Sequence, residues 1–313
     1  MIVKQTFKGP DDRSYDWVDV EHGSVDEITQ TCHDFKVHPL CVETILEGGE
    51  RPRIQDFDDY SFVVLQPLTS TTGDQEFGEL YIILSKKWVL TFHQDRLNEV
   101  EDLRKAMVSG SKALTQGPDF LFYSILSRTL ESYYSMTDRF EGRLEVLEER
   151  VSGPSAEPVL DRMMRVRRDI VSVRRILSYT REVVATMLRE DFYDLNDEDE
   201  RYYRDAHFQL SHLLETTETF REFLSDLRDA YMSSVSLSLN EVMKKLTMVG
   251  TIALPLIVVS GVYGMNLAGL PFAENPLGGL IAVILMILFR RRNREASESV
   301  LQGNVLTKPT GLF

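Results

Sequence analysis

Two stretches without charge near the carboxyl end constrain this chain more than any other feature. Although 27% of the sequence is charged, no charged residue stands between Lys245 and Glu274, and none between Asn275 and Phe289. Residues 246–263 are about as many as a helix needs to cross the hydrocarbon core of a bilayer. Pro255 lies inside this segment, but membrane helices tolerate proline where neighbouring groups satisfy the freed carbonyl. We therefore expect a membrane-spanning helix over 246–263.

The second stretch predicts a shorter span over 275–289. Its most apolar part, 277–289, would cover about 20 Å of a core roughly 30 Å thick, and a buried core helix is the alternative. Arginines that follow this stretch can reach the interface by snorkelling. Because basic residues flank both spans, the positive-inside rule places both termini in the cytosol, with 264–274 as an outward-facing loop and 290–313 as a basic tail. These flanking residues are Lys244, Lys245, Arg290, Arg291, Arg292 and Arg294.

The remainder of the chain is charged and acidic. With 49 acidic and 35 basic side chains, the sequence carries a net charge of −14, which argues against nucleic-acid binding because phosphate contacts need a basic surface. Only two cysteines, Cys32 and Cys41, are present, which excludes a disulfide scaffold and fits a reducing compartment. No P-loop or GxGxxG motif supports nucleotide binding. The amino terminus lacks the apolar core of a signal peptide, so we expect the polar part to stay in the cytosol.

Residues 1–118 have the pattern of an α/β domain. The segments 60–68 and 79–93 predict strands, the second a hairpin that turns near Lys86 and Lys87. Helical spacing over 25–35 and 38–49 predicts two helices, the second ending at two glycines. Four histidines lie in this domain, but no pair has the spacing of a zinc site, so we expect surface or capping histidines. These are His22, His33, His38 and His93. No constellation of residues supports an enzyme.

The middle of the chain is helical. Residues 119–151 and 159–190 predict two long helices, separated by a break at 152–158, and the arginine-rich second helix should pair with glutamates of the first as an antiparallel hairpin. An acidic loop at 194–200 completes this region, 119–204. A heptad pattern from Leu210 to Tyr231 then predicts a stalk helix over 205–245. This helix should continue into the first span, with a total length of roughly 85–90 Å.

One face of the first span and its approach carries polar and small residues. Their spacing of three and four residues places them on one side of a helix. This stripe fits either the lining of a pore or close packing of helices through small residues. A pore would require oligomerisation, because one pair of spans cannot enclose a channel. The residues are Asn240, Met243, Leu246, Thr247, Gly250, Leu254, Ile257 and Gly261.

The sequence after the first span resembles the signature of CorA-type magnesium and cobalt transporters, within the superfamily of two-span GMN transporters. The four residues at 263–266 read YGMN, and NEVMKKLT at 240–247, Pro255, the stalk segment 218–236 and HPLCVETIL at 38–46 occupy the places expected in that family. The resemblance extends from the amino-terminal domain to Phe289. It is therefore carried by the arrangement of the motifs along the chain as well as by the signature itself.

The resemblance implies an α+β membrane protein that assembles as a homopentameric funnel in the cell (inner) membrane. Each subunit would contribute one stalk helix and one pore-lining span, with the second span in an outer ring. A ring of Asn266, shaped by Tyr263, Gly264 and Met265, would meet the hydrated cation, and Met243, Leu246 and Leu254 would form an apolar constriction. The implied function is influx of Mg²⁺, and also Co²⁺ and Ni²⁺, down the electrochemical gradient.

The resemblance also implies gating by intracellular Mg²⁺ bound between subunits. Glu43, Asp205 and Glu131 are the expected ligands, but Thr44 and Ser127 stand where the family has acids. A divalent cation needs several hard oxygen ligands, so we expect feedback sensitivity to be reduced. The outer loop keeps one acid, Glu274, and the tail 295–313 has no counterpart in the family.

Two alternatives remain open. A related branch of the superfamily transports Zn²⁺, although this chain has no histidine or cysteine near the expected pore. The other alternative is a two-span signalling protein whose coiled-coil stalk relays a conformational change, but no output domain follows the second span.

Overall fold

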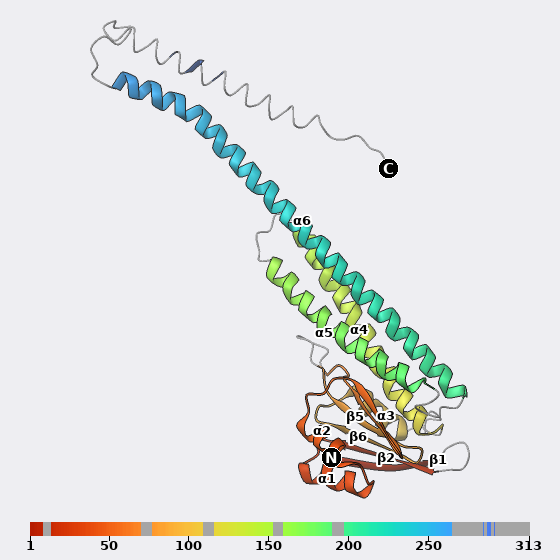
Figure 1. Cartoon of the computed structure of the whole chain (residues 1–313). Coiled ribbons are helices and arrows are strands. Elements are labelled where there is room, and N and C mark those ends of the chain that lie inside the picture. Colours follow the sequence, from red (N-terminus) through yellow and green to blue (C-terminus); the bar gives the residue numbers. More distant parts are fainter. Residues whose placement is uncertain are drawn as a thin grey trace. The chain divides into compact units, whose positions relative to one another are not determined.

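The computed structural model describes residues 1–8, 14–69, 77–108, 116–152, 159–189 and 197–264, together with Ile284, Ile287, Leu288 and Arg291. The chain divides into two compact units, Met1–Asp229 and Ala230–Phe313. The first unit contains a mixed sheet and a bundle of long helices (Figure 1). The predicted α/β domain and helical hairpin therefore belong to one compact unit.

A six-stranded sheet forms the amino-terminal part of this unit. Its strand order is β1-β2-β6-β5-β4-β3, and β2 and β6 are the only parallel neighbours among the described strands. The predicted hairpin is confirmed, because β5 and β6 pair antiparallel and Ser85 N–H donates to Trp88 C=O across the turn. The strands are β1 (Ile2–Lys8), β2 (Ser14–Glu21), β3 (Arg53–Phe57), β4 (Tyr60–Leu65), β5 (Leu80–Leu84) and β6 (Trp88–His93).

Helices α1 (Val25–Asp34) and α2 (Pro39–Glu47) cover one face of the sheet. Ser24 and Glu27 form a capping box at the start of α1, which satisfies two backbone N–H groups that lack helical partners. The side chain of His38 caps α2 by accepting from Leu40 N–H at 3.1 Å, as the capping interpretation predicts. Gly48 and Gly49 follow α2 with φ of 68° and 78°, which confirms the predicted stop because glycine adopts this conformation without strain.

The opposite face of the sheet meets α3 (Asn98–Val108), α4 (Pro118–Ser152) and α5 (Val159–Met187). Tyr133 of α4 is fully buried and donates its hydroxyl proton to the carbonyl of Gln66, 2.8 Å away. Arg51, just before β3, donates to the hydroxyl of Tyr179 on α5 at 2.8 Å. These bonds fix the helical bundle to the sheet.

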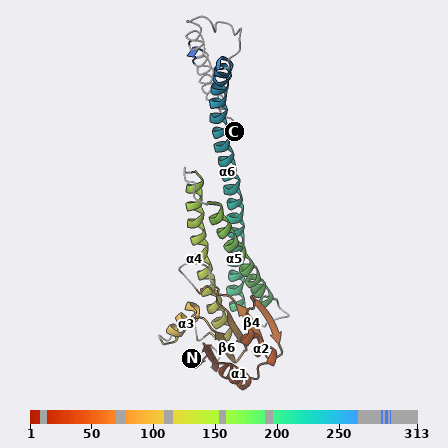
Figure 2. The same cartoon turned by 90° about the vertical axis from the view of Figure 1, so that its left-hand side faces the viewer.

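Helices α4, α5 and the first part of α6 (Asp197–Gly264) run side by side (Figures 1 and 2). The predicted α4 and α5 helices are confirmed, and Gly142 does not interrupt α4. One ion pair between them joins Arg143 of α4 to Asp169 of α5 at 2.8 Å. In this pair the acid lies on α5, whereas the prediction pairs arginines of α5 with glutamates of α4.

The heptad of the stalk packs into the bundle as predicted. Leu210, Leu213 and Thr217 are buried, as are Leu224 and Leu227 one and two turns beyond Phe220. A tyrosine further along the chain, Tyr231, is half-buried. The stalk helix therefore joins the bundle through its first heptads.

Helix α6 begins earlier than the sequence pattern indicates. Residues 197–200, which we expected in an acidic loop, form its first turn, and Glu200 pairs with Arg204 one turn later at 2.6 Å. Tyr203, which is fully buried, donates to the carbonyl of Asp119 at 2.8 Å. This buried contact with α4 extends the helix towards its amino end. At the other end α6 passes through Pro255 without interruption and ends at Gly264, which confirms one continuous helix from stalk to apolar segment.

Candidate functional site

The carboxyl part of α6 is long and apolar enough to cross a membrane, and it is the one helix among the described residues that meets this condition. None of its apolar window is buried within the chain. Leu246, Leu254 and Ile257 each leave more than 60% of their surface exposed. An apolar helix in this state needs lipid or other protein around it.

The predicted polar stripe lies on this unburied surface. Asn240, Met243, Thr247 and Gly261 are exposed, and Gly250 is partly exposed. Among the described residues, a Cβ atom built on Gly250 or Gly261 would meet nothing within 4 Å, so packing within that part of the chain requires neither glycine. Both the pore and the helix-packing interpretations therefore concern contacts beyond the described residues of one chain.

Thr247 illustrates how this helix can present oxygen atoms without breaking. Its hydroxyl donates to the carbonyl of Met243 at 2.8 Å, and Thr251 donates in turn to the carbonyl of Thr247 at 2.8 Å. The hydroxyl proton is thus used within the helix, and the remaining lone pairs of the oxygen are free to accept. A threonine in this state offers an acceptor to a hydrated cation.

The predicted cation-binding signature lies at the end of α6. Tyr263 and Gly264 are the last residues of α6 that the structure describes, and Met265, Asn266 and the outer-loop acid Glu274 lie outside the described residues. The second predicted span is described only at Ile284, Ile287 and Leu288, which are helical and exposed. Of the arginines after it, Arg291 is described and exposed, and Arg290, Arg292 and Arg294 lie outside the described residues.

Two lysines precede the predicted span. Lys245 forms an ion pair with Glu241 at 2.8 Å, one turn earlier on the same helix. The hydrogen bond and charge of Lys245, together with the charge of Lys244, lower the pKa of Glu241. One of the two lysine charges is thus partly compensated, although solvent screens an exposed pair of this kind.

The three carboxylates expected to bind regulatory Mg²⁺ lie on different helices. Glu43 is exposed on α2, Glu131 on α4 and Asp205 on α6. Within the described part of one chain, no three acidic, histidine or cysteine residues form a metal-binding group. Burial, followed by the charges of Asp205 and Glu131, raises the pKa of Tyr123. Asp205 and Glu131 therefore act on the same tyrosine, and Glu43 is not grouped with them.

Thr44 does not face solvent beside Glu43. It is buried, its hydroxyl donates to the carbonyl of Leu40 at 2.9 Å, and it accepts from the guanidinium of Arg53 at 3.4 Å. An acid at this position would sit next to Arg53 rather than on the exposed surface of α2. Ser127, the second departure from the family pattern, is half-buried on α4 and hydrogen-bonds with Tyr123.

The structure contains a buried charged cluster that the sequence analysis missed. Asp19 of β2 lies 3.3 Å from Nε2 of His93 on the neighbouring parallel strand β6, and both side chains are about 98–99% buried. Arg104 of α3 binds Asp19 and also pairs with Glu21 at 2.7 Å. His93 is thus neither a surface nor a capping histidine, which corrects that expectation. An acid and a histidine inside apolar strands were the available signal.

This cluster has perturbed protonation. Burial alone would raise the pKa of Asp19, but His93, a hydrogen bond from Thr91 and the charge of Arg104 outweigh burial and lower it. Burial would likewise lower the pKa of His93, but Asp19 outweighs it and raises the pKa. With His93 protonated, two cations face two carboxylates, so the cluster is electrically balanced.

Comparison with known proteins assigns the family. The model of the family described as "CorA-like Mg²⁺ transporter protein" matches residues 12–290. The cobalt/magnesium transport protein CorA of Thermotoga maritima is 30% identical over 289 residues, covering 88% of this chain and 82% of that protein. The protein of the same name from Methanocaldococcus jannaschii is 28% identical over 287 residues, covering 88% and 90%.

The fold agrees with this assignment. The complete structure of the CorA magnesium transporter from Methanocaldococcus jannaschii matches with a TM-score of 0.81 at 24% identity, covering 90% of this chain and 89% of that one. The α/β domain, the helical bundle and the long helix that enters the apolar segment are thus those of the CorA fold. Because the family model spans most of the sequence, the chain belongs to the CorA-like Mg²⁺ transporter family.

Proposed function

We propose that this chain is a subunit of a homopentameric channel that carries Mg²⁺, and also Co²⁺ and Ni²⁺, through the cell membrane into the cytosol. The observation that carries the proposal is the carboxyl part of α6, an unburied apolar helix with Asn240, Thr247 and Gly250 along one stripe. The relatives named above from T. maritima and M. jannaschii are cobalt/magnesium transport proteins, which supports the choice of ions.

Assembly follows from what one subunit lacks. A single span with an exposed polar stripe cannot enclose an aqueous path, whereas several copies can turn the stripe inward and the remaining apolar surface towards lipid. Met243, Leu246 and Leu254 then form an apolar constriction that closes by dewetting. The second span, over 275–289, surrounds this ring, and both termini lie in the cytosol.

The cation meets the channel at Asn266. Mg²⁺ sheds its water ligands reluctantly, so neutral carboxamide oxygens hold the hydrated ion through its waters without trapping it. Entry is driven by the membrane potential, which contributes about 2.3 kcal/mol per elementary charge per 100 mV. Transport is therefore directed into the cytosol, where the electrical potential is negative.

Ion uptake by proteoliposomes tests the proposal. We expect the purified protein to admit Mg²⁺, Co²⁺ and Ni²⁺, detected with an ion-sensitive dye inside the vesicles, and an inside-negative potential to accelerate uptake. Protein-free vesicles and vesicles held at zero potential are the controls. Uptake of Zn²⁺ alone would favour the zinc branch of the superfamily, and absence of uptake for all four ions would favour the two-span signalling alternative.

A further part of the proposal is that intracellular Mg²⁺ gates the channel by feedback. Asp205 and Glu131 offer the hard oxygen ligands that Mg²⁺ binds, and Glu43 adds a third from α2, which would have to come from a neighbouring subunit. Asp205 currently accepts a hydrogen bond from Gln209 at 2.6 Å, which a cation can replace. Since Thr44 faces Arg53 and Ser127 carries no charge, this site has fewer carboxylates than the family pattern supplies.

We expect Mg²⁺ to protect the protein against protease only well above submillimolar concentration. The remaining protection should disappear in Asp205→Ala, because that substitution removes one of the few carboxylates. Asp226→Ala, which removes another exposed acid from the same helix, is the matched control and should behave as the wild type. Submillimolar protection that is lost in Asp205→Ala would mean that the site has full strength and would contradict the expected loss of sensitivity.

A further inference from the structure

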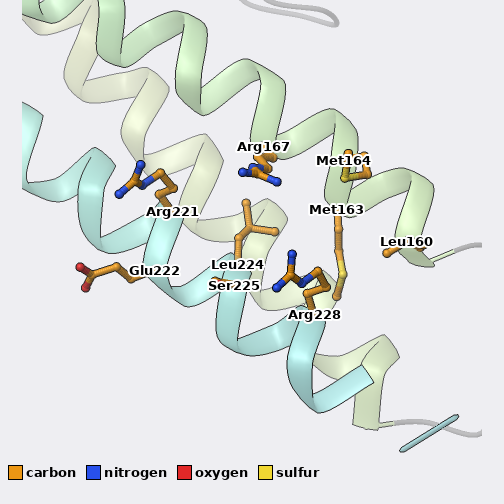
Figure 3. Close-up of a pocket in the computed structure, with 9 residues that line it drawn as sticks. All are labelled: Leu160, Met163, Met164, Arg167, Arg221, Glu222, Leu224, Ser225 and Arg228. Atoms are coloured by element: carbon orange, nitrogen blue, oxygen red, sulfur yellow. The ribbon is translucent and has the colours of Figure 1, made fainter. Parts of the chain in front are cut away.

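A groove runs between α5 and α6 within the first compact unit. It has a volume of about 260 Å³, and its floor is apolar, since Met163 of α5 and Leu224 of α6 are almost completely buried. In Figure 3 Arg221 and Arg228 of α6 lie to the left and right of Leu224, and Arg167 of α5 lies above it. The groove therefore combines an apolar floor with guanidinium groups from both helices.

Few acids neutralise these arginines. The groove is lined by one carboxylate, Glu222, whose side chain points away from the arginines in Figure 3. Arg228 pairs with the adjacent Asp229 at 3.1 Å, and both side chains are at least half exposed, so this pair costs little to exchange. Arg167 has no ion pair within the described part of the chain. Positive charge is thus available to a ligand.

The arginines repeat along both helices. Arg167, Arg174 and Arg181 follow one another at intervals of seven residues on α5, and Arg221 and Arg228 do so on α6. Seven residues are two helical turns, about 10.5 Å, so each series stays on one side of its helix. A second groove of about 610 Å³ between the same helices contains Arg174 and Arg181 and shares Arg221 with the first. The basic lining is therefore continuous along the helix pair.

This concentration of positive charge is unusual in an acidic chain. Helix α5 carries seven arginines against three acids, although the net charge of the whole sequence is −14. In the shared part of the grooves, Glu218 pairs with Arg174 at 3.1 Å and also binds Arg221. One carboxylate thus serves two guanidinium groups, which leaves an excess of positive charge.

We propose that the α5–α6 groove binds a soluble anion that carries a chain of two or three phosphate groups. Guanidinium groups bind phosphate oxygens in a bidentate manner, and Arg167 of α5 together with Arg221 and Arg228 of α6 lines the same groove, so arginines of both helices can bind one short phosphate chain. The apolar floor adjoins the basic lining and accommodates an organic group attached to the phosphates. Such anions bind Mg²⁺ through their phosphate oxygens. The site would therefore let the cytosolic part of a magnesium transporter bind the anions that carry Mg²⁺ in the cell.

Tripolyphosphate is the probe for this site. Binding to the full-length protein in detergent is measured by isothermal titration calorimetry in the presence of EDTA, so that removal of Mg²⁺ by the anion cannot mimic binding. We expect saturable binding that weakens with increasing salt. In the double variant Arg167→Gln, Arg228→Gln the affinity should fall about tenfold or more, because hydrogen bonds to charged groups are lost.

Arg168→Gln is the matched control, since Arg168 is an exposed arginine next to Arg167 that lines none of the described grooves. It should bind tripolyphosphate as the wild type does. Equal weakening in the control would show attraction to the whole basic helix and would overturn the site, as would absence of binding to the wild type. Vesicles with and without anionic phospholipid form a further arm, and binding to anionic vesicles without binding of tripolyphosphate would also overturn it. The readout is independent of transport, so its failure leaves the proposed channel untouched.

Discussion

Asn266→Ala is expected to reduce Mg²⁺ uptake by proteoliposomes to the level of protein-free vesicles. Alanine removes all five carboxamides from the proposed ring at once, so the hydrated cation loses the oxygen acceptors that compensate for partial loss of bulk water at the pore mouth. A carboxylate is not an adequate replacement. Asn266→Asp should bind Mg²⁺ more tightly but release it more slowly, because conduction requires binding weak enough for the ion to leave.

The same assay needs a control in which an asparagine outside the proposed pore is replaced. Asn98→Ala changes an exposed asparagine at the start of α3 and should leave uptake unchanged. Size-exclusion chromatography of each variant establishes that assembly is retained, so that reduced uptake can be attributed to the pore. Wild-type uptake in Asn266→Ala would refute the assignment of this residue to the cation path.

Asp19→Asn is expected to lower the free energy of unfolding of the amino-terminal domain by about 3–5 kcal/mol, the usual cost of removing one partner from a buried ion pair. The substitution keeps the size of the side chain but leaves His93 and Arg104 without the central negative charge. Denaturant unfolding can be followed by tryptophan fluorescence, because the chain has only two tryptophans. One of them, Trp17, donates to Thr91 at 3.0 Å, and Thr91 donates to Asp19 at 2.5 Å.

The matched control lies on the same strand. Asp16 pairs with Lys4 at 3.2 Å near the surface, so Asp16→Asn should cost about 0–1 kcal/mol. The pH dependence separates charge from packing. Since the pKa of His93 is raised above its unfolded value of about 6.5, its contribution is fully present below pH 6.5 and is lost as pH rises through the folded pKa. That loss should be absent in Asp19→Asn, and an identical pH profile or equal costs for both substitutions would contradict the role of the buried pair.

The order of the helices could be predicted from the sequence, but the residue at which α6 begins could not. Long segments without glycine or proline and with apolar spacing of three and four predict α4, α5 and α6, because this signal is repeated over many turns. The first turn of α6 was not predicted, because its acidic residues suggested a solvent-exposed loop. The buried packing of Tyr203 against α4 extends the helix, and that contact joins residues 84 positions apart.

Some parts of the candidate site could likewise be predicted from the sequence, and others could not. The apolar segment and the stripe that includes Asn240 and Thr247 were predicted from spacing along the sequence, and the signature ending at Asn266 was predicted from its resemblance to the family motif. The inward position of Thr44 depended on Arg53 of a different element, and the buried cluster depended on the parallel pairing of β2 with β6. Thr44 has no local pattern that marks its position, and the acid and the histidine inside apolar strands do not by themselves show that they are neighbours.

The absence of charge over 246–263 was enough to predict a membrane segment from the sequence alone, since charges in a bilayer are costly. Helical periodicity likewise determined that a stalk leads into that segment. Only the tertiary structure decided which charges are buried together at Asp19 and His93, and that arginines from α5 and α6 line one groove. These arrangements join residues far apart in the chain, and they depend on strand register and helix packing, which are set by the collective burial of side chains rather than by any local run of residues.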